Sequence, residues 1–207
     1  MLFKLASLSA KAFSKESHLF NNIETYEYAF FIIYSSVLLL LITILLGLCM
    51  HVLLESIMFF LMFFFIRSFA GGYHASTETR CNIISILSIL SCVVLLRCSK
   101  AYDYSSVILF LSVLSAGSIL ILCPLDTPEK PLTQEEHKRF RRTSHLILLI
   151  ISTAIVFSII FKINFILYPA CLSLILESIL LIFGKIKEKH LKESNVREQS
   201  LRDISPR

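Results

Sequence analysis

Long apolar stretches without any charged residue alternate with short polar segments along this chain, most clearly at residues 28–50, 106–122 and 146–161. A hydrocarbon core about 30 Å thick needs roughly 20 apolar helical residues to be crossed. The pattern therefore predicts an all-α, polytopic membrane bundle of about six transmembrane helices, at residues 28–49, 51–66, 82–97, 105–122, 145–161 and 164–183. The second and third stretches are short, so four or five full spans with a re-entrant piece are the alternative.

Two polar regions flank this bundle, which we expect to extend over residues 28–184. In the segment 1–27, Leu5, Leu8, Ala12 and Leu19 recur at helical spacing. This spacing predicts an N-terminal amphipathic helix at the membrane interface. Residues 185–207 are rich in Lys and Arg and are predicted to form a basic cytoplasmic tail. Residues 1–207 are thus expected to form a single integral membrane domain.

Charge adds an orientation to this picture. The 207 residues are 56% hydrophobic and 17% charged, with a formal net charge of +5. Lys and Arg gather in the N-terminal segment, after the fourth span and in the tail, whereas the opposite loops hold only Arg97, Lys100 and Lys162. Positive loops stay inside, so we expect a multi-pass cell-membrane protein with both termini in the cytoplasm. Because the basic residues flank spans, their expected partner is anionic membrane lipid, not nucleic acid.

One polar segment, residues 67–81, interrupts the apolar pattern on the predicted cytoplasmic side. It contains His74 and Cys81, the residue types of a cysteine hydrolase, in which a histidine activates the thiol. On one continuous helix, seven residues would separate their Cα atoms by about 10.5 Å, too far for direct proton transfer. Gly71 and Gly72 permit a turn, and a helix starting near residues 76–77 would let His74 fold back toward Cys81.

Other polar residues fall at suggestive positions within the apolar stretches. Cys81 heads a stripe that is predicted to face other helices and continues with Ser85, Ser88 and Cys92. Glu177 falls at the membrane level of Arg67, so we expect an ion pair that supports the polar segment. Glu55 is expected near the outer face, where it would reach the lipid headgroups.

Two blocks of sequence resemble one known family. Arg67, Gly71-Gly72-Tyr73-His74-Ala75 and Cys81 are similar to the signature of the AgrB (accessory gene regulator B) family, and Cys123-Pro-Leu-Asp-Thr-Pro-Glu-Lys-Pro131 resembles its loop after the fourth span. The resemblance implies a homodimeric membrane cysteine endopeptidase of Gram-positive quorum sensing. Such an enzyme removes the C-terminal tail of an AgrD-type pro-peptide and helps to cyclise the remainder into a thiolactone, or in some members a lactone.

The resemblance also implies roles for individual residues. Cys81 would be the nucleophile and His74 the general base and acid, with Arg67, Gly71 and Gly72 in support. The acidic tail of the pro-peptide would bind basic residues after the fourth span, although these could equally anchor the chain at the membrane: Lys130, Arg139, Arg141 and Arg142.

Three other interpretations remain open from the residues themselves. Glu55, Glu177 and the serine-rich spans are compatible with a small transporter or channel, but no repeated half or paired interrupted helix is recognisable. A catalytically inert scaffold, with Cys81 as a packing residue, is the second alternative. Metal binding by His74 and Cys81 is disfavoured because two ligands do not make a site, so we expect no metal and no cofactor.

Overall fold

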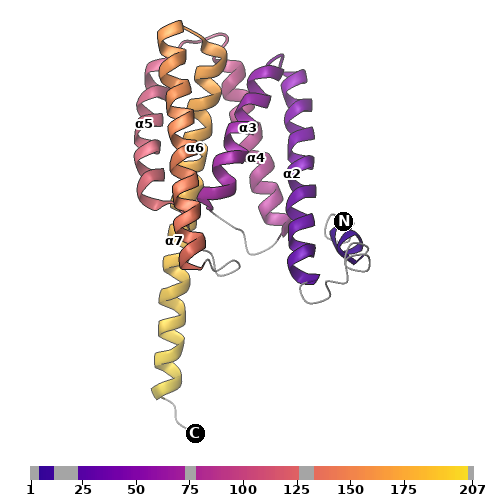
Figure 1. Cartoon of the computed structure of the whole chain (residues 1–207), viewed down its shortest axis with the longest axis vertical. Coiled ribbons are helices and arrows are strands. Elements are labelled where there is room, and N and C mark those ends of the chain that lie inside the picture. Colours follow the sequence, from indigo (N-terminus) through magenta and orange to yellow (C-terminus); the bar gives the residue numbers. More distant parts are fainter. Residues whose placement is uncertain (1–4, 12–22, 73–77, 126–132, 205–207) are drawn as a thin grey trace.

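The computed structural model describes residues 5–11, 23–72, 78–125 and 133–204, and all the regular structure in these ranges is helical. A short helix at residues 5–11 precedes six long ones (Figure 1). The long helices are α2 (Ile23–Cys49), α3 (Leu53–Ala70), α4 (Glu78–Cys98), α5 (Ser105–Leu122), α6 (Gln134–Phe161) and α7 (Asn164–Ile204). All six are long and apolar enough to cross a membrane, which confirms the predicted all-α bundle with six spans.

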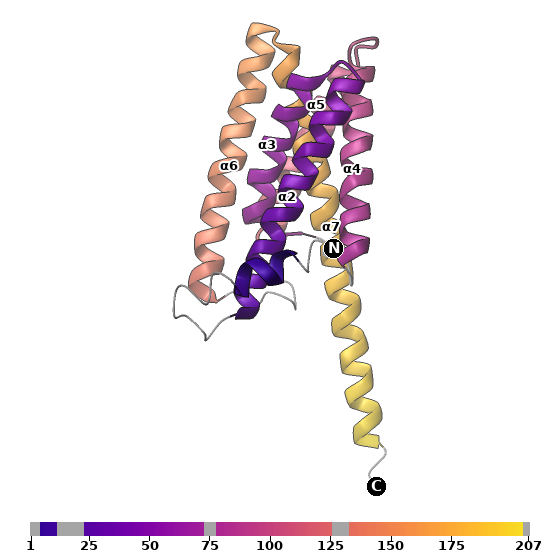
Figure 2. The same ribbon diagram turned by 90° about the vertical axis from the view of Figure 1, so that its right-hand side faces the viewer.

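Successive long helices run in opposite directions, so particular ends of the chain gather together (Figures 1 and 2). The helix at residues 5–11, the ends of α3 and α5 and the starts of α4 and α6 all lie at one end of the bundle, which we call the lower end. The C-terminal part of α7 also leaves the bundle there. Both polar blocks singled out in the sequence are therefore attached to the same end.

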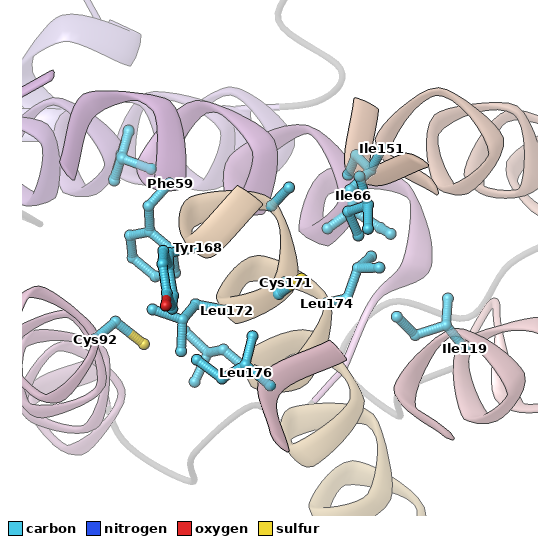
Figure 3. Close-up of a cluster of buried hydrophobic side chains, with 14 of the residues drawn as sticks. Phe59, Ile66, Cys92, Ile119, Ile151, Tyr168, Cys171, Leu172, Leu174 and Leu176 are labelled. Carbon is cyan, nitrogen blue, oxygen red and sulfur yellow. The ribbon is translucent and has the colours of Figure 1, made fainter. Parts of the chain in front are cut away.

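Helix α7 is the centre of the bundle. Within its apolar window 67% of the residues are buried, compared with 6% for α2, and it packs against α3, α5 and α6. Figure 3 shows α7 side chains such as Tyr168, Leu172 and Leu174 between those of the surrounding helices. Most residues of α7 between 167 and 178 are thus shielded from lipid by the neighbouring helices.

Two helices extend further than the predicted spans. Helix α6 begins at Gln134, not at residue 145, because Thr133 and Glu136 form a capping box: Glu136 N–H donates to Thr133 Oγ1 (3.3 Å) and Thr133 N–H donates to Glu136 Oε2 (3.0 Å). Helix α7 continues to Ile204, so most of the predicted basic tail is a helix that projects beyond the bundle (Figures 1 and 2). Among the described residues, the basic residues at both places are therefore carried on helices.

The helix at residues 5–11 lies beside the lower part of α2 and has the two faces expected of an interfacial helix. Ser7 Oγ donates a hydrogen bond to Glu27 Oε1 (2.7 Å), and Ser9 Oγ lies 2.7 Å from Tyr34 Oη. Leu5 and Leu8 are exposed on the outside. Ala12 and Leu19, which were included in the predicted helix, lie outside the described residues.

The opposite, upper end of the bundle is held together by polar contacts. Glu55 in the first turn of α3 is buried and forms an ion pair with Lys100, so the expectation that it reaches the headgroups is wrong. Tyr168 Oη donates to Asp103 Oδ1 (3.1 Å), which also accepts from Ser105 N–H (3.0 Å). The Ser105 N–H, the Ser105 hydroxyl and the Tyr168 hydroxyl together hold the pKa of Asp103 below its ordinary value. These contacts connect the α4–α5 loop to α3 and α7.

Candidate functional site

The first part of the candidate site is the end of α3 and the turn that follows it, residues 67–72, which we call the glycine turn. Gly71 ends the helix with φ of 79°, and its N–H donates to Arg67 O (3.2 Å). Gly72 has φ of 137°. Both values lie in the region that favours glycine, so the Gly-Gly pair allows the chain to turn sharply before α4.

Close packing gives a second reason for the two glycines. A Cβ atom on Gly71 would lie 2.8 Å from the carbonyl oxygen of Leu125, and a Cβ atom on Gly72 would lie 1.7 Å from Arg67 Nη1. A side chain at either position would therefore displace its neighbour. The glycine turn is closed on one side by the backbone after α5 and on the other by the Arg67 guanidinium.

The second sequence block meets the first at this point. Cys123, Pro124 and Leu125 follow α5 and are buried, and Leu125 N–H donates to Ala70 O (3.0 Å). A hydrogen bond buried within the protein is stronger than one made in water. Two segments far apart in the sequence thus form one unit at the lower end of the bundle.

Arg67 connects this unit to the central helix. Its Nη1 donates a hydrogen bond to Gly71 O (2.9 Å) and lies 3.9 Å from Glu177 Oε2 on α7. The Glu177 side chain is fully buried, whereas the Arg67 side chain is 21% exposed. The structure thus brings together the two residues that were expected to pair, while their supporting role stays a prediction.

The basic start of α6 lies next to the glycine turn. The rings of Phe69 and Phe140 make an edge-to-face contact, with centroids 6.0 Å apart. Around Phe140, the side chains of Arg139, Arg141 and Arg142 are exposed on α6. These three predicted substrate-binding residues are therefore accessible beside the turn, whereas Lys130 lies outside the described residues.

Cys81 is the fourth residue of α4 and is half-buried. The other proposed catalytic residue, His74, lies outside the described residues. The stripe that was predicted to pack against other helices is buried only at Cys92, while Cys81, Ser85 and Ser88 are half-exposed. The lower half of α4 therefore leaves Cys81 accessible to a reactant.

A second cysteine of this region has a different environment. Cys123 is 3% exposed. Burial raises the pKa of its thiol and is the largest effect. The nearby Ser144 hydroxyl lowers the pKa by a smaller amount, and the charges of Glu177 and Arg141 respectively raise and lower it. A buried, protonated thiol is a poor nucleophile. Of these two cysteines, Cys81 therefore has the environment that suits a reactive thiol.

Some neighbours of the turn were not found from the sequence. Leu125 and Phe140 contact it from segments distant in the chain, and the only hint was that a Gly-Gly pair suits close backbone approach.

Within the described ranges, no group of three His, Cys, Asp or Glu residues could hold a metal ion.

Comparison with known proteins covers the whole of this site. A family model, "AgrB: Accessory gene regulator B", matches residues 6–181. The chain is 31% identical over 139 residues to "Putative AgrB-like protein 1" of Clostridium perfringens (strain 13 / Type A), covering 65% of this chain and 70% of that protein. It is 25% identical over 171 residues to "Putative AgrB-like protein 2" of the same organism, covering 79% and 80%. No solved structure is significantly similar. The family match spans both sequence blocks and five transmembrane helices and extends into the sixth, and the chain therefore belongs to the AgrB family.

Proposed function

We propose that this protein is a membrane cysteine endopeptidase that removes the C-terminal tail of an AgrD-type pro-peptide and promotes cyclisation of the remainder. The observation that carries the proposal is the placement of Cys81. It is half-exposed in the first turns of α4, which follows a glycine turn held by α6, α7 and the segment after α5, in a chain of the AgrB family. The start of a helix also favours a negatively charged thiolate.

In the proposed reaction, His74 takes the proton of the Cys81 thiol, and the thiolate attacks the carbonyl carbon of the scissile peptide bond. The C–N bond then breaks, and His74 returns the proton to the leaving amine of the tail. The remaining pro-peptide is held on Cys81 as a thioester. A thiol of the substrate gives its proton to His74 and attacks this thioester, which forms the ring and releases Cys81, reprotonated by His74.

The position of the site explains why cyclisation can compete with hydrolysis. A substrate thiol exchanges one thioester for another, whereas attack by water would lose the energy stored in the bond. Partial exclusion of water at the edge of an apolar bundle therefore favours the cyclic product. The half-burial of Cys81 supports this feature of the proposal.

The orientation in the membrane is also part of the proposal. Lys and Arg are concentrated at the lower end of the bundle, which predicts that this end faces the cytoplasm. A newly made pro-peptide would then reach Cys81 directly. Its acidic tail would bind the exposed Arg139, Arg141 and Arg142 of α6, together with Lys130.

Co-expression with short pro-peptides encoded beside the gene tests the activity. Intact mass spectrometry should detect the released tail with the unaltered protein and with Cys49→Ala, because Cys49 is an exposed cysteine at the upper end of α2. Cys81→Ala and His74→Ala should each abolish cleavage. Tail release that continues in Cys81→Ala would exclude the proposed mechanism.

A further inference from the structure

Glu177 is an unusual residue for the centre of a membrane bundle. It lies in the membrane-spanning part of α7, its side chain is fully buried, and neither carboxylate oxygen accepts a hydrogen bond from the described residues. Burying a carboxylate without hydrogen bonds is costly, and ionisable residues within membrane spans usually serve a function. Core packing alone does not account for a carboxylate at this position.

Arg67 is the ion-pair partner that the structure shows for Glu177. The distance of 3.9 Å between Nη1 and Oε2 is too long for a hydrogen bond, so the two groups interact through their charges. The same Nη1 is 2.9 Å from Gly71 O, which makes it the donor of a hydrogen bond to the glycine turn. The carboxylate on α7 thus faces a guanidinium that itself holds backbone.

The guanidinium also occupies the space above Gly72. A Cβ atom built on Gly72 would lie only 1.7 Å from Arg67 Nη1. A shift of Arg67 would therefore open space beside the turn. The chain then continues from Gly72 to His74 through a single residue. Arg67 therefore contacts the backbone two residues before His74 in the sequence.

We propose that Glu177 is a positioning residue for the catalytic pair. Its negative charge holds Arg67 against Gly71 and Gly72, the turn from which the chain leads on to His74. This inference rests on the proposed function and names the residue through which α7 acts on the site. In this role Glu177 acts through Arg67 and not on the substrate itself.

The other contacts of the turn define how large the effect should be. Leu125 N–H and the Phe140 ring hold the turn independently of Glu177. Removing the charge of Glu177 should therefore loosen the turn without unfolding it. A displacement of about 1 Å in a catalytic group lowers a reaction rate by up to about a hundredfold. We therefore expect Glu177→Gln to lower the rate of pro-peptide cleavage by about tenfold to a hundredfold.

The test measures the reactivity of Cys81 in the purified full-length protein in detergent, and needs no pro-peptide. Iodoacetamide modification of the peptide containing Cys81 is followed by mass spectrometry as a function of pH. If His74 pairs with Cys81, His74→Ala should shift the profile toward slower modification at neutral pH, because the thiolate is the form that reacts. Glu177→Gln, which keeps the shape but removes the charge, should move it in the same direction, and Glu177→Asp should restore part of the unaltered profile.

Glu55→Gln is the matched control, because Glu55 is another buried carboxylate paired with a basic residue, but at the upper end of the bundle. It should leave the Cys81 profile unchanged. Thermal unfolding of each variant shows whether it is folded. If Glu177→Gln does not accumulate, the Cys81 profile of Glu177→Asp is compared with that of the unaltered protein instead.

The outcomes separate the two proposals. If His74→Ala shifts the profile while Glu177→Gln and Glu177→Asp leave it unchanged, the positioning role is wrong and the proposed activity stands. If His74→Ala causes no shift, the His74–Cys81 pair is wrong, and the role of Glu177 is overturned with it. A shift in Glu55→Gln as large as that in Glu177→Gln would show a general effect of buried charge and would also overturn the positioning role.

Discussion

Leu125 donates a backbone hydrogen bond of 3.0 Å to Ala70, and this bond joins the segment after α5 to the end of α3. The carbonyl oxygen of the same Leu125 faces Gly71, where it would lie 2.8 Å from a Cβ atom. The two segments can approach in this way only because residue 71 has no side chain. Their contact explains why both of the sequence blocks that resemble the AgrB family belong to one site.

Gly71→Ala should therefore damage the site directly. The φ of 79° is strained for alanine, which costs about 1–3 kcal/mol, and the new methyl group would push Leu125 away. We expect a lower unfolding temperature in detergent and loss of pro-peptide cleavage.

Gly117→Ala is the control for this change, because a Cβ atom there meets nothing within 4 Å and residue 117 lies inside α5. It should be neutral or slightly stabilising, since alanine is the better helix former. Equal loss of stability in the two variants would contradict the role assigned to the contact between Gly71 and Leu125.

The separate parts of this structure differ in how well the sequence predicts them. Six spans follow from the length of the apolar stretches, because the membrane imposes a minimum on each helix. The level of Glu177 could be matched with that of Arg67 by counting along two spans. The start of α6 is less predictable, because hydropathy marks only the apolar residues from 145 onward, whereas Thr133 and Glu136 begin the helix in a polar segment.

The contacts of Leu125 and Phe140 are harder to predict. They join segments that are distant in sequence, and their partners follow from how α3, α5 and α6 are arranged in space. No local spacing or propensity encodes that arrangement.

Removing Arg67 should expose the energetic cost of the buried carboxylate. Arg67→Ala leaves Glu177 without its counter-charge, which should destabilise the fold by about 3–5 kcal/mol. In the double variant Arg67→Ala/Glu177→Gln the uncompensated charge is gone, so much of this stability should return. Cleavage should stay low, because the glycine turn still lacks the hydrogen bond from Arg67 to Gly71.

Denaturant unfolding of the two single variants and the double variant in the same detergent measures the coupling. Simple addition of the two single effects would argue against an energetic pair.

The cysteines of the site should differ in reactivity. Cys81 is half-buried at the start of α4, whereas Cys123 is buried and the pKa of its thiol is raised. At about pH 8 a smaller fraction of the Cys123 thiol is therefore ionised than of an ordinary thiol. Iodoacetamide should modify Cys81 first, and Cys123 should react only after unfolding or at higher pH. Equal rates for the two peptides in the folded protein would contradict the environments described above.

The upper end of the bundle should respond to acid through Asp103. The pKa of this carboxyl is lowered by the Ser105 N–H, with further help from the Ser105 and Tyr168 hydroxyls. A lowered folded-state pKa stabilises the protein above the ordinary value of about 3.9, and this stability is lost as the pH falls through the folded-state value. Asp103→Asn should therefore lower the unfolding temperature near neutral pH and flatten its dependence in acid. Parallel curves for the two proteins would show that titration of Asp103 does not contribute to the loss of stability in acid.

The orientation of the bundle can be tested with two matched reporter cysteines. Tyr102 is 72% exposed in the α4–α5 loop at the upper end, and Glu135 is exposed in the first turn of α6 at the lower end. Because Lys and Arg gather at the lower end, a membrane-impermeant maleimide should label Tyr102→Cys in intact cells and Glu135→Cys only after permeabilisation. Mass spectrometry of the labelled peptides distinguishes the reporters from the native cysteines. Labelling of Glu135→Cys in intact cells would place the Cys81 end outside, where a pro-peptide made in the cytoplasm could not reach it.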